Sequence, residues 1–469
     1  MYAVENLRTS LYTGVKHTKW FFVKRNEKMK MILPEKVNFI INKLQEHGYE
    51  GYAVGGCVRD AMLSRIPQDW DITTSAKPEE VKALFRHTID TGIQHGTVTV
   101  MLEHEGFEVT TYRIDGEYED ARHPKEVQFT SNLLEDLKRR DFIINAMAYN
   151  AKDGLVDAFD GLGDLQRGII RCVGVAEERF TEDALRMLRA VRFAAQLGFE
   201  IETNTKEAIK KLAPNLAKVS VERIQMELVK LLTSPHPEEI RTAWETGLTK
   251  VFLPEFDKMM ETGQNHPHHK YSVGEHTIVA LQNAAPKKIL RLTMLLHDMA
   301  KPVCKTTDEN GIDHFFGHQP KGGEMAKSIL RRLKFDNDTT NRVSKLVVCH
   351  DSRPEPTEKA IRKAVFKNGT EQYPLLFEVQ RADVLAQSEF QREEKLKMID
   401  LYEKEYKNII TKKQCLSLKE LAVKGADLIA LGMQPGKEIG ETLQKLLEIV
   451  LEEPELNTKE KLIEQVHKM

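Results

Sequence analysis

The first regular pattern of apolar residues lies between residues 34 and 46, where four of them recur at the spacing of one helix face: Val37, Ile40, Ile41 and Leu44. Residues three and four apart lie on the same side of an α-helix, so this segment is predicted to be an amphipathic helix. Gly48 ends the pattern in the way a C-cap glycine does. A helix is therefore expected to open the folded part of the chain.

Four short runs with strand composition follow, at residues 51–54, 70–74, 97–102 and 107–112. Between the second and the third run, residues 78–85 have a helical pattern. After Asp157 the strand signals fade, and nearly everything from Thr181 onward has the pattern of helices broken by proline and glycine. The predicted fold class is α+β, with a sheet-containing head followed by an all-α neck, body and tail.

The length and charge of the chain place only weak limits on the number of domains and on the kind of partner. Its 469 residues exceed what one hydrophobic core usually serves, so about two to four units are expected. The composition, 41% hydrophobic and 30% charged, is typical of a globular protein. Because 69 basic and 71 acidic residues nearly cancel, an RNA partner would have to be held by local basic patches.

The cysteines and the apolar runs indicate the cellular setting. The five cysteines are odd in number and widely spaced, which argues against a disulfide framework or a cysteine zinc knuckle. A reducing, cytoplasmic setting fits them best. No apolar run approaches the roughly 20 residues of a membrane helix, so neither a membrane span nor a signal peptide is expected. Residues 1–31 are basic and non-periodic and are predicted to form a disordered extension.

Two glycines come directly after the first predicted strand, in the sequence GGCVRD at residues 55–60, which opens a helix. Glycine allows the backbone N–H groups to approach a phosphate closely, and a helix N-terminus favours negative charge. A triphosphate is a suitable ligand for such a turn. Taken alone, a plain tight turn is the more common explanation.

Asp69 and Asp71 follow a short distance further on and change this balance. Alternation along a strand places residues i and i+2 on the same face, so both carboxylates are expected to point the same way. Like charges this close are costly unless a cation joins them, and hard oxygen ligands with water and phosphate select Mg²⁺. The pair therefore predicts two-metal phosphoryl transfer to a 3′-hydroxyl, rather than a loop or a helix cap.

At this point the chain resembles the nucleotidyltransferases related to DNA polymerase beta, and among them the bacterial class II CCA-adding tRNA nucleotidyltransferases and bacterial poly(A) polymerases. The similarity covers about residues 32–235 and rests on four motifs in family order: GGCVRD at 55–60, DWD at 69–71, RRDFIINA at 139–146 and EDALRMLR at 182–189 with Arg192. The resemblance implies addition of C, C and A to the tRNA 3′ end from CTP and ATP without a nucleic-acid template. It implies that Asp69 and Asp71 hold Mg²⁺, and that seven residues bind the nucleotide: Gly56, Arg59, Arg140, Asp183, Arg186, Arg189 and Arg192.

The side-chain chemistry of Asp183 and Arg186 also supports recognition of the nucleotide base. They are three residues apart and are expected to be neighbours on one helix face. A carboxylate accepts from an exocyclic amine while a guanidinium donates to a ring nitrogen, and cytosine and adenine show this edge whereas uracil and guanine do not. An intrahelical ion pair is the alternative, but the resemblance favours base selection.

Two neighbouring features leave more than one interpretation open. Glu108, on the predicted strand 107–112, is either a third carboxylate of the site or an ordinary surface residue. The polar segment 113–125 is a candidate for a mobile loop that couples C addition to A addition.

The helical half contains six residues in the order shown by HD-domain phosphohydrolases: His276, His297, Asp298, His318, His350 and Asp383. Imidazole and carboxylate donors of this kind suit Mn²⁺, Ni²⁺, Fe²⁺ or Zn²⁺. A metal there would activate water to hydrolyse phosphate esters, such as a 2′,3′-cyclic phosphate on damaged RNA ends. Alternatively, the ion is structural, in a domain that helps to grip tRNA. His266, His268 and His269 fall outside this order and are interpreted as linker residues.

Three functions compete: a CCA-adding enzyme, a poly(A) polymerase or CC-only or A-only adding enzyme of the same fold, and an HD phosphohydrolase as a second or main activity. Binding of tRNA is expected to be salt-sensitive, and the oligomeric state stays open. The predicted organisation comprises six parts: the extension 1–31, a nucleotidyltransferase head 32–165, a neck 166–235 that binds the base and RNA, a helical linker 236–270, an HD domain 271–400 and a tRNA-binding tail 401–469.

Overall fold

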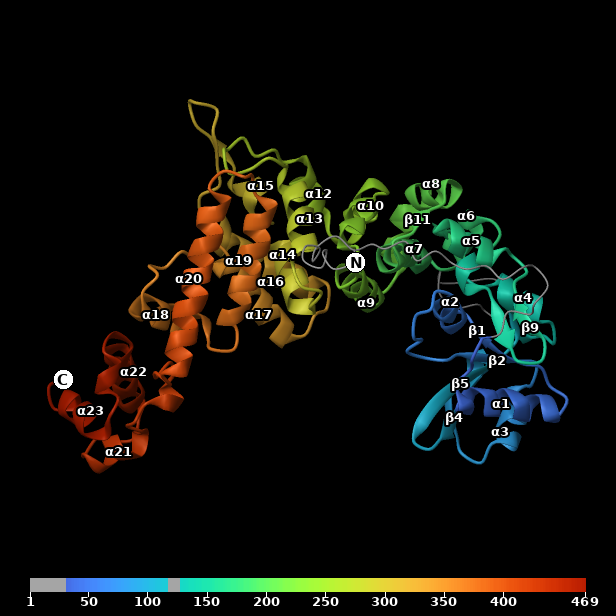
Figure 1. Ribbon diagram of the computed structural model, residues 1–469, viewed down its shortest axis with the longest axis horizontal. Helices are drawn as coiled ribbons and strands as arrows, with labels where there is room; N and C mark the ends of the chain where they lie inside the picture. Colours follow the sequence, from blue (N-terminus) through green and yellow to red (C-terminus); the bar gives the residue numbers. More distant parts are fainter. Residues whose placement is uncertain (1–30, 117–126) are drawn as a thin grey trace, which may run out of the picture.

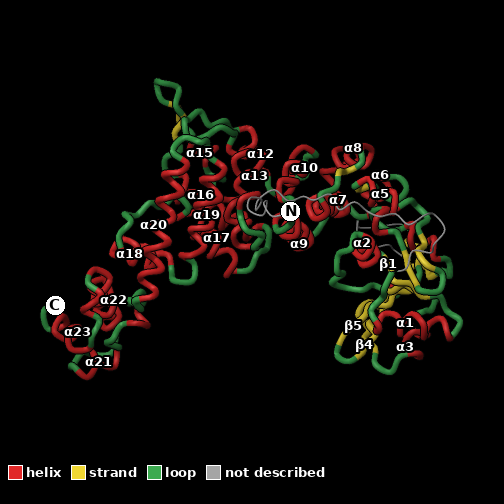
Figure 2. Tube along the Cα trace, in the orientation of Figure 1, coloured by secondary structure: helices red, strands yellow, loops and turns green. Residues whose placement is uncertain are grey.

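The computed structural model describes residues 31–116 and 127–469. Figure 1 shows an elongated, curved molecule with a sheet-containing head at one end and the C-terminal helices at the other. Strands gather almost entirely in the head, and helices build the rest (Figure 2), so the predicted α+β class is confirmed. Nearly all of the predicted extension, residues 1–30, and residues 117–126 of the predicted loop region lie outside the described residues.

The head is built on one mixed sheet of seven strands in the order β3-β4-β5-β2-β1-β8-β9. Neighbouring strands are antiparallel, except that β2 and β5 run parallel. The strands span these residues: β1 (Gly51–Val54), β2 (Ile72–Thr74), β3 (Thr88–Gly92), β4 (Thr97–Leu102), β5 (Glu105–Thr111), β8 (Ala148–Asn150) and β9 (Gly154–Val156). A separate antiparallel pair consists of β6 (Arg113–Asp115) and β7 (Val127–Phe129).

Helices cover both faces of this sheet near β1. Successive residues of a strand point to opposite faces, and accordingly Ala53 belongs to the core beneath the first helices, whereas Tyr52 and Val54 belong to a separate cluster with Leu133 and Leu137. The head helices are α1 (Glu35–Glu46), α2 (Gly56–Met62), α3 (Pro78–Leu84), α4 (Leu133–Lys138) and α5 (Gly161–Arg167). The predicted helices at 34–46 and 78–85 are thus α1 and α3, each to within one residue.

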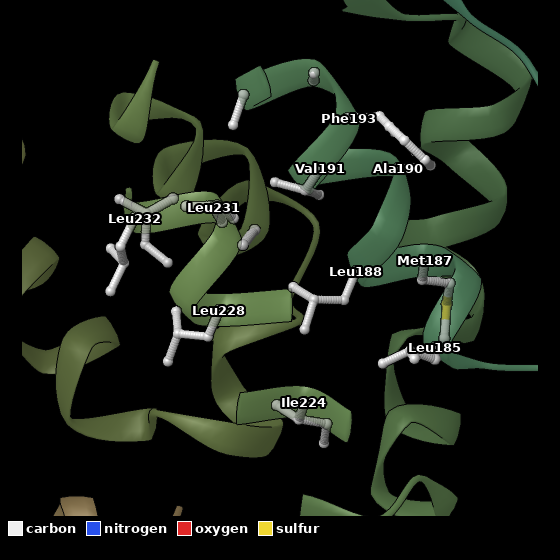
Figure 3. Close-up of a cluster of buried hydrophobic side chains, with 14 of the residues drawn as sticks. Leu185, Met187, Leu188, Ala190, Val191, Phe193, Ile224, Leu228, Leu231 and Leu232 are labelled. Atoms are coloured by element: carbon white, nitrogen blue, oxygen red, sulfur yellow. The ribbon is translucent and has the colours of Figure 1, made fainter. Parts of the chain in front are cut away.

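Four helices form the next segment of the molecule: α6 (Ala176–Glu182), α7 (Leu185–Leu197), α8 (Thr203–Leu212) and α9 (Val221–Leu232). Figure 3 shows the apolar contact between α7 and α9, where Leu188 and Val191 face Leu228 and Leu231. Their spacing of three residues places each pair on one helix face, and burial of such side chains contributes about 1.5–3 kcal/mol each. Two short parallel strands, β10 (Ile169–Ile170) and β11 (Glu200–Ile201), tie the start of this segment to the head.

The C-terminal half is helical, as predicted, apart from one small hairpin of β12 (Thr306–Thr307) and β13 (Asp313–His314). Among the described residues, no helix is both long and apolar enough to cross a membrane. The helices are α10 (Ile240–Glu245), α11 (Thr249–Phe252), α12 (Pro254–Glu261), α13 (Val273–Asn283), α14 (Lys288–Leu296), α15 (Lys301–Cys304), α16 (His318–Arg332), α17 (Asn337–Cys349), α18 (Glu358–Asn368), α19 (Tyr373–Ala386), α20 (Arg392–Thr411), α21 (Gly425–Ala430), α22 (Lys437–Glu452) and α23 (Lys459–Val466).

Two large cores run along the molecule. One is continuous from α1 through α7 and α9 to α19, so the head and the central helices share one apolar interior. The other joins α18 and α20 to α22 and α23, together with faces of α17 and α19. The C-terminal helices therefore share this second interior with α17, α18 and α19.

Candidate functional site

The glycine turn leads from β1 into α2 and is closed by an arginine. Gly55 has φ +81°, and a Cβ atom there would lie 2.8 Å from Nη1 of Arg140. Both the left-handed backbone and the close approach of the guanidinium require glycine at this position. The backbone N–H of Val54 donates to the carbonyl of Asp71 at 3.0 Å, which brings the predicted metal-binding pair beside the turn.

Asp69 and Asp71 lie in the loop just before β2 and not on the strand, so the expected strand alternation is wrong. Regular pairing with β1 begins only at Ile72, opposite Ala53. The parallel register explains what the site contains instead: Ile72 lies opposite Val109 of β5, so the preceding residues, Asp71 and Glu108, are neighbours. Glu108 is therefore placed beside the aspartates.

The charges of these three carboxylates affect one another. Desolvation raises the pKa of Asp71, and the negative charge on Asp69 acts in the same direction, against the lowering effect of Arg140. Desolvation also raises the pKa of Glu108, as do the charges on Asp71 and Asp69. Three oxygen donors that repel one another in this way are a suitable donor set for Mg²⁺.

The arginines beside the glycine turn are held by buried partners. Arg59, only 8% exposed, donates from Nη1 to Oδ1 of Asn145 at 2.7 Å. Arg140 donates to Oδ2 of Asp136 at 3.3 Å, and Asp136 is fully buried. Asn145 and Asp136 had no role in the predicted site. The contact of Asn145 with Arg59 comes from the tertiary fold, whereas Asp136 lies only four residues before Arg140 and could have been found from that spacing.

Asp183 and Arg186 do not form a pair in this structure. The expectation that they share a helix face is wrong, because α6 ends at Glu182 and Asp183 is extended (φ −141°, ψ 103°) at the junction with α7. The Asp183 carboxylate accepts from Arg223 of α9 at 2.7 Å, whereas Arg186 donates to Glu182 at 2.8 Å. Arg223 lies on a later helix, so the sequence carried no signal for this contact.

Arg189 and Arg192, both on α7, contact buried acidic residues, one in the head and one on α9. Arg189 donates to Oδ2 of Asp141 at 2.6 Å, and Arg192 donates to Glu227 at 2.7 Å. Three guanidinium groups lie near the centre of the Phe193 ring: that of Arg189 at 5.4 Å, that of Arg192 at 3.6 Å and that of Arg59 at 5.0 Å. Attraction between a guanidinium and the face of an aromatic ring therefore links the head to the neck here.

Replacing Asp141 by asparagine is expected to lower the free energy of unfolding by about 1.5–3 kcal/mol, the value of a hydrogen bond to a charged group. Burial alone would raise the pKa of Asp141, but Arg189 and Asn145 outweigh it and hold this pKa below its ordinary value. Because the pKa of this carboxyl group is lower in the folded than in the unfolded protein, its charge stabilises the fold at pH values above the unfolded-state pKa. This stabilisation is lost as the pH falls through the folded-state pKa.

The loss caused by Asp141→Asn should accordingly be larger at about pH 7 than at about pH 3 in urea unfolding, since the unfolded Asp titrates near 3.9. Asp90→Asn, at an exposed position in the middle of β3, is the control and should change little at either pH. An equal loss at both pH values would contradict the role given to the Asp141 charge.

The six histidine and aspartate residues predicted as metal ligands converge in the helical half, and we call them the histidine centre: His276, His297, Asp298, His318, His350 and Asp383. Two groups have ligand atoms within 4.8 Å of one another, and Asp298 belongs to both. Its Oδ2 lies 3.2 Å from Nε2 of His297, and its Oδ1 lies 3.6 Å from Nε2 of His318. Oδ1 of Asp383 lies 3.0 Å from Nε2 of His276.

The hydrogen bonds of the histidine centre leave one nitrogen of each ring directed inward. Nδ1 lies within hydrogen-bonding distance of a backbone carbonyl in all four histidines, between 2.7 and 3.2 Å. A Nδ1–H donor leaves the Nε2 lone pair available to a metal ion. Oδ1 of Asp298 is buried without a hydrogen-bond partner. This donor set fits a divalent cation.

The charge balance of the centre also fits a cation. Burial would lower the pKa of His297, but Asp298 and Asp383 outweigh it and raise this pKa to about 10. The same surroundings hold the pKa of both carboxyl groups well below the ordinary value, against the opposing effect of burial. The two buried carboxylates therefore favour positive charge between them.

A cavity of about 420 Å³ opens beside this centre. His266, His268 and His269 line it from the segment between α12 and α13, so the residues interpreted as a linker also contribute side chains to this cavity. The segment folds back because Asn265 exchanges hydrogen bonds with Asp313 of the hairpin, at 2.7 and 2.9 Å. Sequence order alone carries no sign of this long-range contact.

Three family models match consecutive parts of the chain. Residues 51–171 match the "Poly A polymerase head domain", and residues 198–260 match the model for the RNA- and SrmB-binding site of polymerase A. Residues 314–466 match domain 2 of tRNA nucleotidyltransferases. A head of this type, with interacting carboxylates beside a glycine turn, defines a nucleotidyltransferase.

Within this class, the chain belongs to the family of CCA-adding enzymes. The CCA-adding enzyme of Ligilactobacillus salivarius is 37% identical over 433 residues, which are 92% of this chain and 95% of that protein. That of Leuconostoc mesenteroides is 57% identical over 193 residues, and this match spans about half of the relative, 48% of its length. The predicted resemblance is confirmed, and enzymes of this family are metal-dependent, generally on Mg²⁺.

A solved structure is similar along nearly the whole chain. The Bacillus stearothermophilus CCA-adding enzyme in complex with CTP has a TM-score of 0.68 and 30% identity, and the match covers 92% of this chain and 96% of that one. The agreement therefore extends through the helical half and is not confined to the head. The HD domain predicted at 271–400 stays a prediction.

Proposed function

We propose that this chain adds C, C and A to the 3′ end of tRNA, taking the nucleotides from CTP and ATP without a nucleic-acid template. The observation that carries the proposal is the position of Asp69, Asp71 and Glu108 beside the Gly55 turn, in a chain of this family. The solved relative from Bacillus stearothermophilus is in complex with CTP, which supports CTP as a substrate of this chain.

In this proposal the three carboxylates hold Mg²⁺, which would lower the pKa of the attacking 3′-hydroxyl and neutralise charge on the triphosphate. The Gly55–Gly56 turn admits the phosphates, and Arg59 and Arg140 donate to their oxygens. Because the buried Asn145 and Asp136 hold both arginines, the donors are oriented before the nucleotide arrives.

Asp183 and Arg186 are proposed to select the base. Each has a protein partner in this structure, but Arg186 can keep Glu182 and still donate to the ring nitrogen of the base, since a guanidinium has five N–H donors. Asp183 can keep Arg223 and still accept from an exocyclic amine, since a carboxylate has about four acceptor positions. Arg189, whose side chain is 33% exposed, is proposed to contact the nucleotide, and the buried Arg192 to support it from behind.

A purified-protein assay on tRNA lacking its tail tests this function directly. With CTP alone the expected product carries two C residues, and with both nucleotides it carries the complete CCA end. Addition of A without C, or of a long A tail, would replace the proposal by a poly(A) or A-adding enzyme. Products that stop at two C residues in the presence of both nucleotides would identify a CC-adding specialist.

We further propose that the histidine centre binds Mn²⁺, Ni²⁺, Fe²⁺ or Zn²⁺ and hydrolyses phosphate esters. The inward Nε2 atoms of four histidines and the unpartnered Oδ1 of Asp298 support this second activity. A bound ion would supply a water of lowered pKa. A purely structural ion is the competing interpretation, and the absence of phosphatase activity from metal-loaded protein would favour it.

The organisation that we propose keeps the predicted boundaries: head 32–165, neck 166–235, linker 236–270, HD domain 271–400 and tail 401–469. The matched head model, at 51–171, supports the first division, whereas the RNA-binding model, at 198–260, spans parts of both the proposed neck and the proposed linker. We place the enzyme in the cytoplasm, where tRNA is found, and its five free cysteines agree with a reducing compartment.

A further inference from the structure

The aromatic ring of Phe193, on α7, gathers positive charge from two parts of the chain. Arg189 and Arg192 belong to the same helix, whereas Arg59 comes from α2 of the head. Burial lowers the pKa of Arg192, and the like charge on Arg189 acts in the same direction. The attraction of each guanidinium to the negative face of the ring opposes this repulsion. The ring therefore helps to keep three cations together.

The orientation of the Phe193 ring is set by the core around it. The side chain is only 4% exposed, and its ring meets the fully buried ring of Phe142 in a T-shaped contact. The two centroids are 5.7 Å apart, and the interplanar angle is 80°. Aromatic pairs favour this edge-to-face arrangement. The ring thus presents a defined face to the arginines.

Each of the three guanidinium groups also has a carboxylate partner, at 2.6 to 2.8 Å: Asp60 for Arg59, Asp141 for Arg189 and Glu227 for Arg192. A carboxylate holds a guanidinium at the expense of its charge, because the two opposite charges largely cancel. An aromatic ring has no net charge. It can therefore hold a guanidinium and leave the positive charge available to an anionic ligand.

Two of the three arginines can contribute to the nucleotide site. A Cβ atom at Gly56 would lie 3.7 Å from Nη2 of Arg59, so this guanidinium borders the glycine turn. The side chain of Arg189 is 33% exposed. Arg192 is only 6% exposed and pairs with the buried Glu227. The ring therefore carries one interior guanidinium and two that can act on a ligand.

We propose that Phe193 is a positioning residue of the nucleotide site, whose ring holds Arg59 and Arg189 in the orientation that receives the triphosphate. The inference rests on the proposed function of the head, and it adds to the site a side chain without any polar atom. Donors that are oriented in advance need no rearrangement when the negative charge arrives. Loss of the ring face should therefore weaken binding of the triphosphate, whichever base the nucleotide carries.

Replacement of Phe193 by pentafluorophenylalanine tests this role. The fluorinated ring has nearly the same shape and stays apolar, but its fluorine atoms withdraw electrons and reverse the charge of the ring face. Isothermal titration calorimetry measures binding of CTP and, as a probe without a base, of inorganic tripolyphosphate, both with Mg²⁺. Both probes are expected to bind about 5- to 30-fold more weakly, the range for loss of two guanidinium–ring contacts.

A monofluorinated ring at position 193, which weakens the ring face without reversing it, should give an intermediate loss for both probes. A side chain that only fills space would not follow the fluorine content in this way. Phe193→Leu, which removes the aromatic face, should also weaken both probes. The control is pentafluorophenylalanine in place of Phe256, which is fully buried on α12 in the helical half, and it should leave both affinities unchanged.

The proposal is overturned if the pentafluorinated ring at position 193 binds both probes as tightly as the wild type does. Weaker binding of CTP with unchanged binding of tripolyphosphate would also contradict it, because the effect would then not act through the phosphates. An equal loss from the replacement at Phe256 would assign the effect to packing in general. Wild-type protein that binds neither probe would instead refute the nucleotide site of the head, and this inference with it.

Discussion

Asp71→Ala is expected to lower the rate of CCA addition about 10³- to 10⁵-fold, while the protein remains folded. The carboxylate is proposed to hold Mg²⁺ beside the triphosphate, and a metal ion supplies several kcal/mol of stabilisation to developing charge, at about 1.4 kcal/mol per tenfold in rate. Removing one of three mutually repelling carboxylates should not unfold the head, since desolvation and the charges on Asp71 and Asp69 already raise the pKa of Glu108 in the wild type. Single-turnover addition of C to tailless tRNA measures the effect.

Asp69→Ala should have an effect of similar size, and Asp90→Ala, which removes an exposed aspartate of the same head, should have almost none. Glu108→Gln tests whether Glu108 is a third metal ligand or an ordinary surface residue. The rate of CCA addition should fall strongly if Glu108 is a ligand, and should not change if it is a surface residue. Retention of more than a tenth of the wild-type rate by Asp71→Ala would remove the basis of the proposed metal site.

Asp298→Asn is expected to reduce metal binding at the histidine centre about 100-fold or more and to abolish phosphohydrolysis. Even partners that only contact a ligand change metal affinity 10- to 100-fold, and Asp298 reaches both groups of histidines. Asparagine has nearly the same volume but lacks the negative charge that His297 and Lys301 face at 3.2 and 2.8 Å. Metal content after dialysis, followed by elemental analysis, measures the change.

CCA addition by Asp298→Asn should be close to normal, because the aspartates of the head and the histidine centre lie on different segments of the elongated molecule (Figure 1). His467→Ala, near the exposed C-terminus, serves as the histidine control. If His297→Ala stopped CCA addition as completely as Asp71→Ala, the proposed division of labour between the two sites would be wrong.

The sequence predicted the parts of the fold that local periodicity determines. Helix α1, strand β1 and strand β4 have the predicted bounds to within a residue, because their apolar spacing is regular and glycines mark their ends. Strands β3, β8 and β9 were not predicted. They have three to five residues each, too few for a clear alternation of apolar and polar residues, and β8 in addition pairs with the distant strand β1.

The candidate sites show the same limit. Motif spacing identified Asp69, Asp71 and the six residues of the histidine centre, which the fold brings together as expected. The pairing of Asp183 with Arg223 could not be predicted, since a helix break at residue 183 turns the carboxylate toward α9. Contacts between residues far apart in the chain depend on packing, and one sequence contains little information about them.

The apolar interior that is continuous from α1 to α19 determines which parts of the chain can be separated from one another. An isolated head that ended at the proposed boundary would expose apolar side chains that now pack against the neck, so we do not expect it to fold as an independent domain. The C-terminal helices pack around the second interior, so a change in the tail would leave the interior of the head intact.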